Sequence, residues 1–223
     1  MQRRDFLISS ATAAGAFAFL GLPSTAYAGG KWVTITKERG VTVTNRREKN
    51  RQFPTFRGTG RVKANILDVF AVISDADRQK EWMHKCADSA MLKVIDDKTR
   101  ITYNRTDAPW PVKDRDCTLR AKVQIITPQK EIKIRFRAIK TKLKGEVADV
   151  VRMPVLEGHW YLVGMGGDKT LVEYQVNADP AGELPDWVVE QTSKDLPLHT
   201  IVNLRKQVKA TMGQYEDFKA KWA

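Results

Sequence analysis

Three histidines and a cysteine are the residues whose types could carry nucleophilic or metal chemistry. His84, His159 and His199 lie far apart in the sequence, and no two of them have the spacing of a metal-ligand pair. His84 precedes Cys86 by two residues, which would suit a thiolate activated by an imidazole. Spacing alone does not establish that geometry, so we interpret the two as surface residues near the end of a helix. We expect no catalytic residue and no metal site.

The motifs of the common enzyme classes are absent. The chain has no Gly-x-Ser-x-Gly, no phosphate loop, no Gly-x-Gly-x-x-Gly and no Cys-x-x-Cys. No motif therefore supports a serine hydrolase, a nucleotide-binding protein or a zinc protein. We expect a protein that is not an enzyme and that carries no cofactor.

The N-terminus has the pattern of an export signal. Paired arginines, Arg3 and Arg4, precede Phe6, an uncharged run follows over residues 8–22, and a small-residue cleavage site ends at Ala28. We interpret residues 1–28 as a twin-arginine-type signal peptide and residues 29–223 as one domain. The predicted location is the periplasm.

The chain contains two cysteines, Cys86 and Cys117. An exported protein could form a disulfide between them, but substrates of the twin-arginine route typically fold before export. A spacing of this kind does not require a bridge. Whether the two are bridged stays open on the sequence alone.

The chain is strongly basic, with a formal net charge of +12. Residues 113–144 alone contain 11 basic and 3 acidic residues. Such a balance fits an anionic surface, and for an exported protein acidic lipid headgroups are a more accessible partner than nucleic acid. We expect an anionic membrane surface as a partner and no nucleic acid, although charge of this size also serves solubility.

The elements that must position these residues are mostly strands. Residues 32–36 and 41–45 alternate apolar and polar side chains, as do residues 119–125 and 132–138. In the last of these, Ile132, Ile134 and Phe136 share one face, while Lys133 and Arg135 share the other. We expect an antiparallel sheet with an apolar inner face and a basic outer face, and a short helix over residues 66–73.

The C-terminal third predicts a long amphipathic helix. From Leu198 to Trp222, apolar residues recur at steps of three or four. Pro185 suits a first helical turn, whereas Pro197 is expected to kink the helix or to split it. A helix of this length could fold back over the concave face of the sheet and leave a cavity between them.

Five segments together resemble a START domain, the lipid-transfer domain related to the steroidogenic acute regulatory protein. They are Trp32 with Gly40-Val41, Trp82, residues 108–116 (Ala-Pro-Trp-Pro-Val-Lys-Asp-Arg-Asp), residues 153–160 (Met-Pro-Val-Leu-Glu-Gly-His-Trp) and residues 179–187 (Asp-Pro-Ala-Gly-Glu-Leu-Pro-Asp-Trp). The resemblance covers about residues 32–215. It implies an α+β helix-grip fold, in which a curved antiparallel sheet wraps around the long C-terminal helix and encloses a hydrophobic cavity for one lipid.

The resemblance also implies a set of lipid-binding residues. On the sheet and its neighbours we expect Thr102, Tyr103, Ala121, Phe136, Met153, Trp160 and Tyr174, and on the helix Trp187, Val188, Leu198, Ile201 and Val202. For each of them, packing in an ordinary core is an equal alternative. Lys130, in a turn expected near the cavity mouth, would dock on membrane phosphates together with Lys133 and Arg135.

The chain departs from one pattern of the family. Sterol-carrying members that hold an acidic and a basic side chain inside the tunnel would place them near Thr102 and Ala121, and neither is charged here. Anchoring of a sterol hydroxyl on an internal ion pair is thus in doubt. Arg115-Asp116 matches an Arg-Asp pair of the family, for which we expect a structural role.

Three functions remain open on the sequence. The first is a monomeric periplasmic lipid-binding and transfer protein that holds one sterol-like, hopanoid or acyl lipid and exchanges it with membranes, with a membrane transport complex as a further candidate partner. The second is an enzyme of the related aromatase/cyclase type, for which Tyr103, Asn104 and His159 are candidate cavity groups. The third is a ligand-sensing accessory protein.

Overall fold

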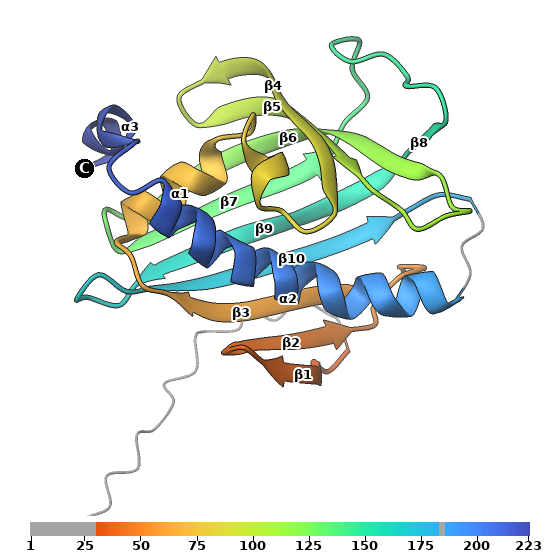
Figure 1. Cartoon of the computed structure of the whole chain (residues 1–223), viewed down its shortest axis with the longest axis horizontal. Coiled ribbons are helices and arrows are strands. Elements are labelled where there is room, and N and C mark those ends of the chain that lie inside the picture. Colours follow the sequence, from red (N-terminus) through yellow and green to blue (C-terminus); the bar gives the residue numbers. More distant parts are fainter. Residues whose placement is uncertain (1–29, 183–185) are drawn as a thin grey trace, which may run out of the picture.

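The structure is a computed structural model that describes residues 30–182 and 186–223, with side chains described outside residues 183–193. The predicted signal peptide and Pro185 lie outside the described residues. Most of the described chain forms one curved sheet, and a long helix crosses its concave side (Figure 1). The strands are β1 (Val33–Glu38), β2 (Val41–Arg46), β3 (Thr55–Val62), β4 (Cys86–Asp96), β5 (Thr99–Thr106), β6 (Asp114–Thr127), β7 (Glu131–Ala138), β8 (Val150–Arg152), β9 (Val155–Gly164) and β10 (Thr170–Asp179). The helices are α1 (Ile66–Ser74), the 3-10 turn η1 (Gln79–Glu81), α2 (Asp186–Ala210) and α3 (Glu216–Trp222).

The sheet has the order β1-β2-β3-β10-β9-β7-β6-β5-β4 and is not closed. Each adjacent pair along this order is antiparallel, so the N-terminal hairpin pairs with the last strand of the chain through β3 and β10. The short strand β8 is an exception, because it pairs with β6 in parallel. The predicted α+β helix-grip fold is confirmed, with β8 as an element that the sequence analysis did not predict.

Alternation along β6 and β7 builds the two faces of the sheet. Ala121 is paired with Phe136 and Val123 with Ile134, so these side chains lie on the same, inner face. Lys122, which lies between Ala121 and Val123 on β6, is exposed on the outer face. The predicted apolar inner face and basic outer face are therefore present.

The predicted short helix forms as α1 and closes one end of the concave face. The side chain of Asn65 caps it by accepting a hydrogen bond from the backbone N–H of Leu67 at 2.9 Å. Nearly all residues of α1 are buried, including Val69 and Phe70 with 0% exposure. Helix α1 is therefore part of the hydrophobic core and not a surface element.

Helix α2 lies directly on the backbone of β3. The guanidinium of Arg205 donates to the carbonyl oxygens of Arg61 (2.8 Å), Arg39 (2.6 Å) and Gly40 (2.9 Å). A β-carbon at Gly60 would lie 2.9 Å from Nη2 of Arg205 and 3.0 Å from Cγ2 of Ile201, so the glycine favours this close approach. The helix is thus fastened to the turn between β1 and β2 and to β3.

The C-terminal helix is shorter than the sequence predicted. Pro197 was expected either to kink the helix or to split it; it lies inside a continuous α2, so it does not split the helix. The helix ends instead at Ala210, and α3 begins at Glu216 after Gly213, whose φ of +79° breaks the helix. The apolar residues after the break still reach the core, because Phe218 and Trp222 pack against Phe70 at centroid distances of 5.1 and 5.2 Å.

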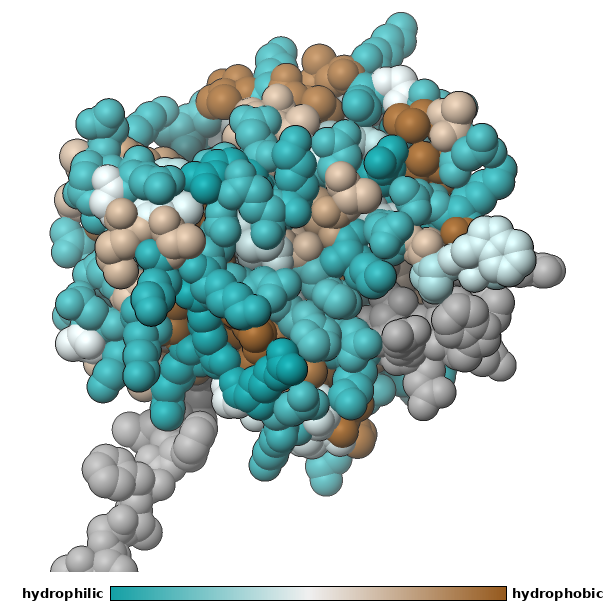
Figure 2. Space-filling view, viewed as in Figure 1, coloured by the Kyte–Doolittle hydropathy of each residue, from teal (hydrophilic) through white to brown (hydrophobic). Residues whose placement is uncertain are grey.

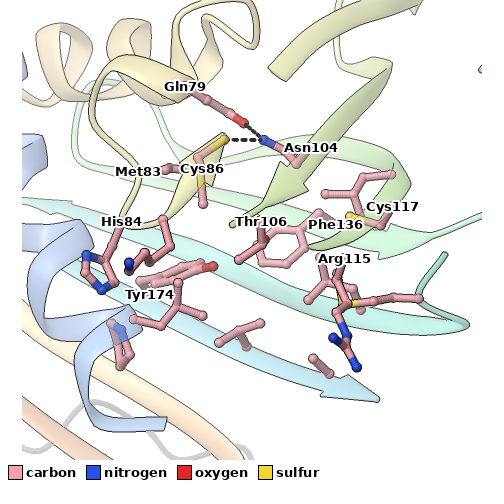
Figure 3. Close-up of a pocket in the computed structure, with 18 of the residues that line it drawn as sticks. Gln79, Met83, His84, Cys86, Asn104, Thr106, Arg115, Cys117, Phe136 and Tyr174 are labelled. Atoms are coloured by element: carbon pink, nitrogen blue, oxygen red, sulfur yellow. Dashed lines mark hydrogen bonds between the residues drawn. The ribbon is translucent and has the colours of Figure 1, made fainter. Parts of the chain in front are cut away.

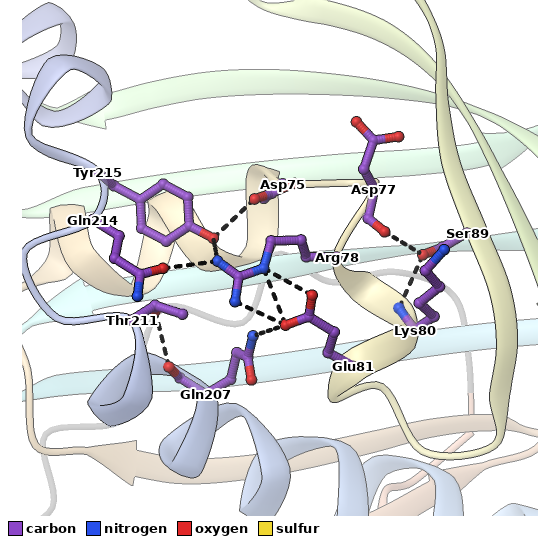
Figure 4. Close-up of polar contacts among 10 residues, drawn as sticks. All are labelled: Asp75, Asp77, Arg78, Lys80, Glu81, Ser89, Gln207, Thr211, Gln214 and Tyr215. Atoms are coloured by element: carbon purple, nitrogen blue, oxygen red, sulfur yellow. Dashed lines mark hydrogen bonds and ion pairs between the residues drawn. The ribbon is translucent and has the colours of Figure 1, made fainter.

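A polar network fixes the C-terminal end of α2 against η1 (Figure 4). Arg78 donates to the carboxylate of Glu81 at 2.8 to 3.0 Å and to the side-chain oxygen of Gln214 at 2.9 Å. Gln207, on α2, donates to the same Glu81 carboxylate at 2.7 Å. The hydroxyl of Tyr215 donates to Asp75 at 2.8 Å. The end of α2 is therefore held to the segment after α1 by side chains as well as by packing.

One face of the molecule is mostly polar. In the face shown by Figure 2, hydrophilic side chains cover most of the molecule and hydrophobic residues occur in separate small patches. Within residues 30–182 and 186–223, no helix has the length and apolar character needed to cross a bilayer.

Candidate functional site

A cavity of about 320 Å³ lies between the inner face of the sheet and the helices α1 and α2. Most of its wall is apolar. The apolar lining includes Phe56, Ile73, Ala76, Met83, Leu119, Ala121, Ile134, Phe136, Met153, Leu156, Trp160, Tyr174, Val176, Ala178, Leu196 and Pro197. Its volume falls within the range of small-molecule sites, about 300 to 1,000 Å³. The predicted hollow interior is therefore present.

Aromatic side chains from neighbouring strands form one wall of the cavity. Trp160 on β9 is paired with Tyr174 on β10, and their rings are stacked with centroids 4.1 Å apart and an interplanar angle of 18°. Phe136, on β7, lies 6.2 Å from the Tyr174 ring. Burial raises the pKa of Tyr174 well above its ordinary value, so its hydroxyl stays protonated. This wall offers flat apolar surface and one hydroxyl.

The opposite wall is more polar and comes mainly from β5. Thr102, Asn104 and Thr106 alternate along this strand and all line the cavity. The amide of Asn104 donates to the side-chain oxygen of Gln79 at 3.0 Å and to Sγ of Cys86 at 3.7 Å (Figure 3). The cavity is therefore two-sided, with an aromatic wall facing a wall that carries hydrogen-bonding groups.

The two cysteines, Cys86 and Cys117, line the same cavity as free thiols. Burial raises the pKa of both thiols. Because a thiol with a raised pKa is protonated near neutral pH, neither is an activated nucleophile. The structure thus answers the question of a bridge that the sequence left open.

His84 is not the surface residue that the sequence analysis predicted. It lines the cavity and its ring stacks on that of His199 with centroids 4.8 Å apart. Burial lowers the pKa of His84, and the neighbouring His199 lowers it further. The backbone N–H of His84 donates to the hydroxyl of Thr200 at 3.3 Å. This contact joins the segment before β4 to α2.

Arg115 lines the cavity near the segment after β10 and has the structural role expected of it. Its Nη1 donates to the carbonyl oxygen of Lys113, its Nε to that of Pro180 at 3.3 Å, and its Nη2 to that of Ala181 at 3.4 Å. All three nitrogens are engaged with backbone oxygens. The guanidinium therefore ties the start of β6 to the end of β10.

Six of the predicted lipid-binding residues line the cavity. They are Thr102, Ala121, Phe136, Met153, Trp160 and Tyr174. They come from β5, β6, β7, β9 and β10 and from the residue after β8, so the fold gathers positions up to 72 residues apart around one cavity.

Tyr103 does not line the cavity, so this prediction is wrong. It is paired with Thr118 on the outer face of the sheet, whereas its neighbour Thr102 is paired with Leu119 on the inner face. Tyr103 is still only 1% exposed, because the segment before β8 covers it and Lys144 lies 4.4 Å from the centre of its ring. Burial and the charge of Asp116 raise the pKa of Tyr103 to about 12.

The predicted helical contacts are also corrected. Leu198 and Ile201 are buried at 1% and 0% in the core, and Val202 packs against the same core, but none of them lines the cavity. Helix α2 contributes Leu196 and Pro197 instead. Leu198 and its neighbours point to the sheet because α2 packs tightly on β3. The side chains of Trp187 and Val188 lie outside the described residues.

The predicted docking residues lie on or beside the outer face. Lys130 and Arg135 are exposed, and Lys133 is half-buried with its Nζ 5.7 Å from the centre of the Tyr161 ring. The turn that holds Lys130 contributes no residue to the cavity wall, so its predicted place near the mouth is not supported. The loop between β5 and β6 reaches the cavity instead, through Pro109 and its neighbours.

Trp110 is the most exposed of the large apolar side chains described, at 90%. Pro109 and Val112, on either side of it, line the cavity. An exposed tryptophan therefore stands beside a loop that forms part of the cavity wall.

The described residues contain no group of three or more His, Cys, Asp or Glu side chains arranged to hold a metal ion. The polar groups of the cavity, among them Thr102, Asn104 and Thr106, are suited to hydrogen bonding. Arrangements of this kind orient a guest molecule.

Comparison with known proteins identifies the family. The family described as "START domain" matches residues 25–215 of the sequence. The chain belongs to the START domain family. Among curated proteins, an uncharacterized protein of Pseudomonas aeruginosa is 30% identical over 174 residues, which cover 78% of this chain and 85% of that protein.

Solved structures of START proteins share the fold. A STAR-related lipid transfer protein from Xanthomonas axonopodis is 31% identical, with a TM-score of 0.72 over 80% of this chain and 98% of the other. Human StAR-related lipid transfer protein 5 is 18% identical, with a TM-score of 0.71 over 80% of this chain and 86% of its own chain. This family and fold support lipid binding as the general function of the domain.

Proposed function

We propose that this START domain is a periplasmic lipid-binding and transfer protein that holds one hydrophobic lipid in its cavity and exchanges it with membranes. The observation that carries the proposal is the apolar cavity between the sheet and α2, with Trp160 and Tyr174 stacked in its wall. Moving a lipid from water into such a site gains about 0.8 kcal/mol per buried methylene group. A mostly apolar wall therefore favours binding of a hydrophobic guest.

Exchange with membranes is supported by charge and by one exposed aromatic residue. The chain has a formal net charge of +12, and Lys130 and Arg135 are exposed on the outer side of the sheet. Trp110, beside the cavity wall, has the amphipathic ring that is enriched at membrane interfaces. Attraction to acidic headgroups would bring the protein to a leaflet, and Trp110 would insert at the headgroup level. The periplasmic location is inferred from the pattern of residues 1–28.

The enzyme alternative receives no support from the positions of its candidate groups. Tyr103 lies on the outer face, and His159 lies there too, with its Nε2 3.0 Å from the carboxylate of Glu173. Asn104 does line the cavity, but an amide is not a titratable group. A ligand-sensing accessory role would use the same cavity, and a partner captured only in the lipid-bound state would favour it over transfer.

A transfer assay between vesicles tests the proposal. Donor vesicles carry a fluorescent sterol or a fluorescent acyl lipid, acceptor vesicles carry none, and the purified protein is added in catalytic amount. We expect transfer by the unaltered protein and little transfer by Ala121→Phe, because the larger side chain on the inner face of β6 would fill part of the cavity. Arg120→Gln, on the exposed outer face of the same strand, is the matched control and should transfer normally.

Two results would contradict the proposal. One is that neither lipid moves faster with the protein than without it. The other is that Ala121→Phe, folded as judged by circular dichroism, transfers lipid as fast as Arg120→Gln. Fractionation of the native host, followed by detection of the protein with an antibody, tests the periplasmic location separately.

A further inference from the structure

Arg100 is a cavity-lining cation whose charge is not neutralised by a described carboxylate. It lies on β5 two residues before Thr102 and is paired with Ala121, so its side chain leaves the sheet on the inner face. Its Nη1 donates to the backbone carbonyl oxygen of Ser74 at 2.9 Å. Among the described residues it forms no salt bridge, and neither Nε nor Nη2 donates a hydrogen bond to a described protein group.

Arg100 differs in this respect from the other charged residues around the cavity. Arg115 uses all three of its nitrogens on backbone oxygens. Lys85 is paired with Asp107 at 3.5 Å, and Asp195 lies 3.9 Å from Nε2 of His199. Arg100 is half-buried, and a guanidinium with two uncommitted nitrogens that is partly withdrawn from water gains from an anion that compensates its charge.

A second polar group lies at the same place. Ser74, the last residue of α1, also lines the cavity, and its hydroxyl is buried without a hydrogen-bond partner. Buried hydroxyls normally have a partner. Because the carbonyl oxygen of Ser74 already accepts from Arg100, the serine hydroxyl and the guanidinium lie at the same end of the cavity. Rotation about one bond would let this hydroxyl donate to a ligand that reaches Arg100.

The position of Arg100 sets the orientation of a ligand. The lining residues of β5 run from Arg100 through Thr102 and Asn104 to Thr106, which at about 3.3 Å per residue spans roughly 20 Å. Arg100 lies at the end bounded by α1, and Thr106 lies at the end bounded by the loop that carries Trp110. A ligand whose charged group meets Arg100 would therefore have its chain directed toward that loop.

We propose that the cavity accepts a lipid with an acidic headgroup, a carboxylate or a phosphate monoester, and that this headgroup is inserted first and pairs with Arg100 and Ser74. The planar fork of a guanidinium matches the two oxygens of either group. The aromatic wall formed by Trp160 and Tyr174 would then hold the apolar chain. This inference rests on the proposed function, because it names the class of lipid that the same cavity would carry.

Binding of a matched pair of lipids tests the inference. The delipidated full-length protein is titrated with palmitate and with hexadecanol, which have the same chain length and differ in charge. We expect palmitate to bind more tightly. Arg100→Gln should weaken palmitate binding about 10- to 100-fold, the range for hydrogen bonds to a charged group, and leave hexadecanol binding unchanged. Arg100→Lys should keep part of the preference, and Arg120→Gln on the outer face should keep all of it.

Three other results would overturn the inference, and a fourth would overturn the proposed function. Equal binding of palmitate and hexadecanol by the unaltered protein would overturn the inference and leave the proposed function standing. Equal weakening of both lipids by Arg100→Gln would show a structural role only, and would also overturn it. If inorganic phosphate displaced palmitate from the unaltered protein but not from Arg100→Gln, the site would bind free anions and not a lipid headgroup. If neither lipid bound and vesicle transfer also failed, the proposed function itself would fall.

Discussion

Gly58 on β3 lies against Pro197 in the middle of α2. A β-carbon at Gly58 would lie 3.0 Å from Cβ of Pro197, 3.1 Å from its carbonyl oxygen and 3.0 Å from Cδ1 of Ile201. Real β-carbons rarely approach other atoms so closely, so the helix sits as near to the sheet as a glycine allows. The proline at the centre of α2 is therefore part of the contact that holds the helix over the concave face.

Gly58→Ala should destabilise the protein, because the added methyl group must push α2 away from β3. We expect a loss of about 1–3 kcal/mol in the free energy of unfolding, the usual cost of overpacking a tight contact. Urea unfolding followed by tryptophan fluorescence measures it. Gly145→Ala is the matched control, because a β-carbon there meets no atom within 4 Å. Equal stability of the two variants would contradict the tight contact.

Asp116→Asn should destabilise the protein by removing one partner of a buried ion pair. The carboxylate of Asp116, with 1% of its side chain exposed, accepts from Nε and Nη2 of Arg152 at 2.6 and 3.0 Å. Breaking such a pair costs about 3–5 kcal/mol. Asp149→Asn removes the carboxylate of an exposed pair with Lys113 at 3.1 Å and should change stability by less than about 0.5 kcal/mol. A small effect of Asp116→Asn would show that Arg152 finds another partner.

The stability of the protein should fall as the pH drops below about 6.5, in part through His84. Burial lowers the pKa of His84 in the folded state, and the charges of His199 and Lys85 lower it further while Asp195 opposes them. The unfolded chain binds a proton near its ordinary pKa of about 6.5, so this contribution is complete above that pH and is lost as the pH falls toward the folded pKa. Melting temperatures between about pH 7.5 and 5.5 should drop less for His84→Gln than for the unaltered protein. Parallel curves for the two proteins would exclude His84 as a contributor.

Trp110→Ala should weaken association with acidic vesicles without changing stability. The side chain is 90% exposed, so its removal should alter the free energy of unfolding by no more than about 0.5 kcal/mol. Loss of an inserted aromatic ring should reduce vesicle binding about tenfold or more. Sedimentation with vesicles rich in anionic lipid measures the binding, and raising the salt concentration should weaken it further. Met165→Ala, at another exposed apolar residue, should bind as the unaltered protein does.

The sequence predicted the fold well where a local signal was strong. Asn65 marks the start of α1, and alternation over residues 119–125 correctly separates the inner from the outer face of β6. It failed where two neighbouring residues were equally plausible. Thr102 and Tyr103 cannot both face the cavity, and only the register with Thr118 and Leu119 shows which of them does.

The candidate site was only half predictable for the same reason. Arg100 could have been found, because it lies two residues from Thr102 and therefore on the same face of the strand. His84 and Trp110 could not, since their exposure depends on how an irregular segment packs on the rest of the chain. The break near Gly213 was visible as a glycine, but apolar residues continue at helical spacing on both sides of it. Periodicity alone therefore suggested one long helix.

The pairing of β3 with β10 has a consequence for how the molecule reaches its native state. Val62 on β3 and Thr170 on β10 are partners, so β1, β2 and β3 join the rest of the sheet only after β10 has been synthesised. Contacts between such distant parts of a chain slow folding. During synthesis the edge of β3 would stay unpaired until β10 has emerged from the ribosome. A chaperone that shields strand edges would have its greatest effect on yield in this period.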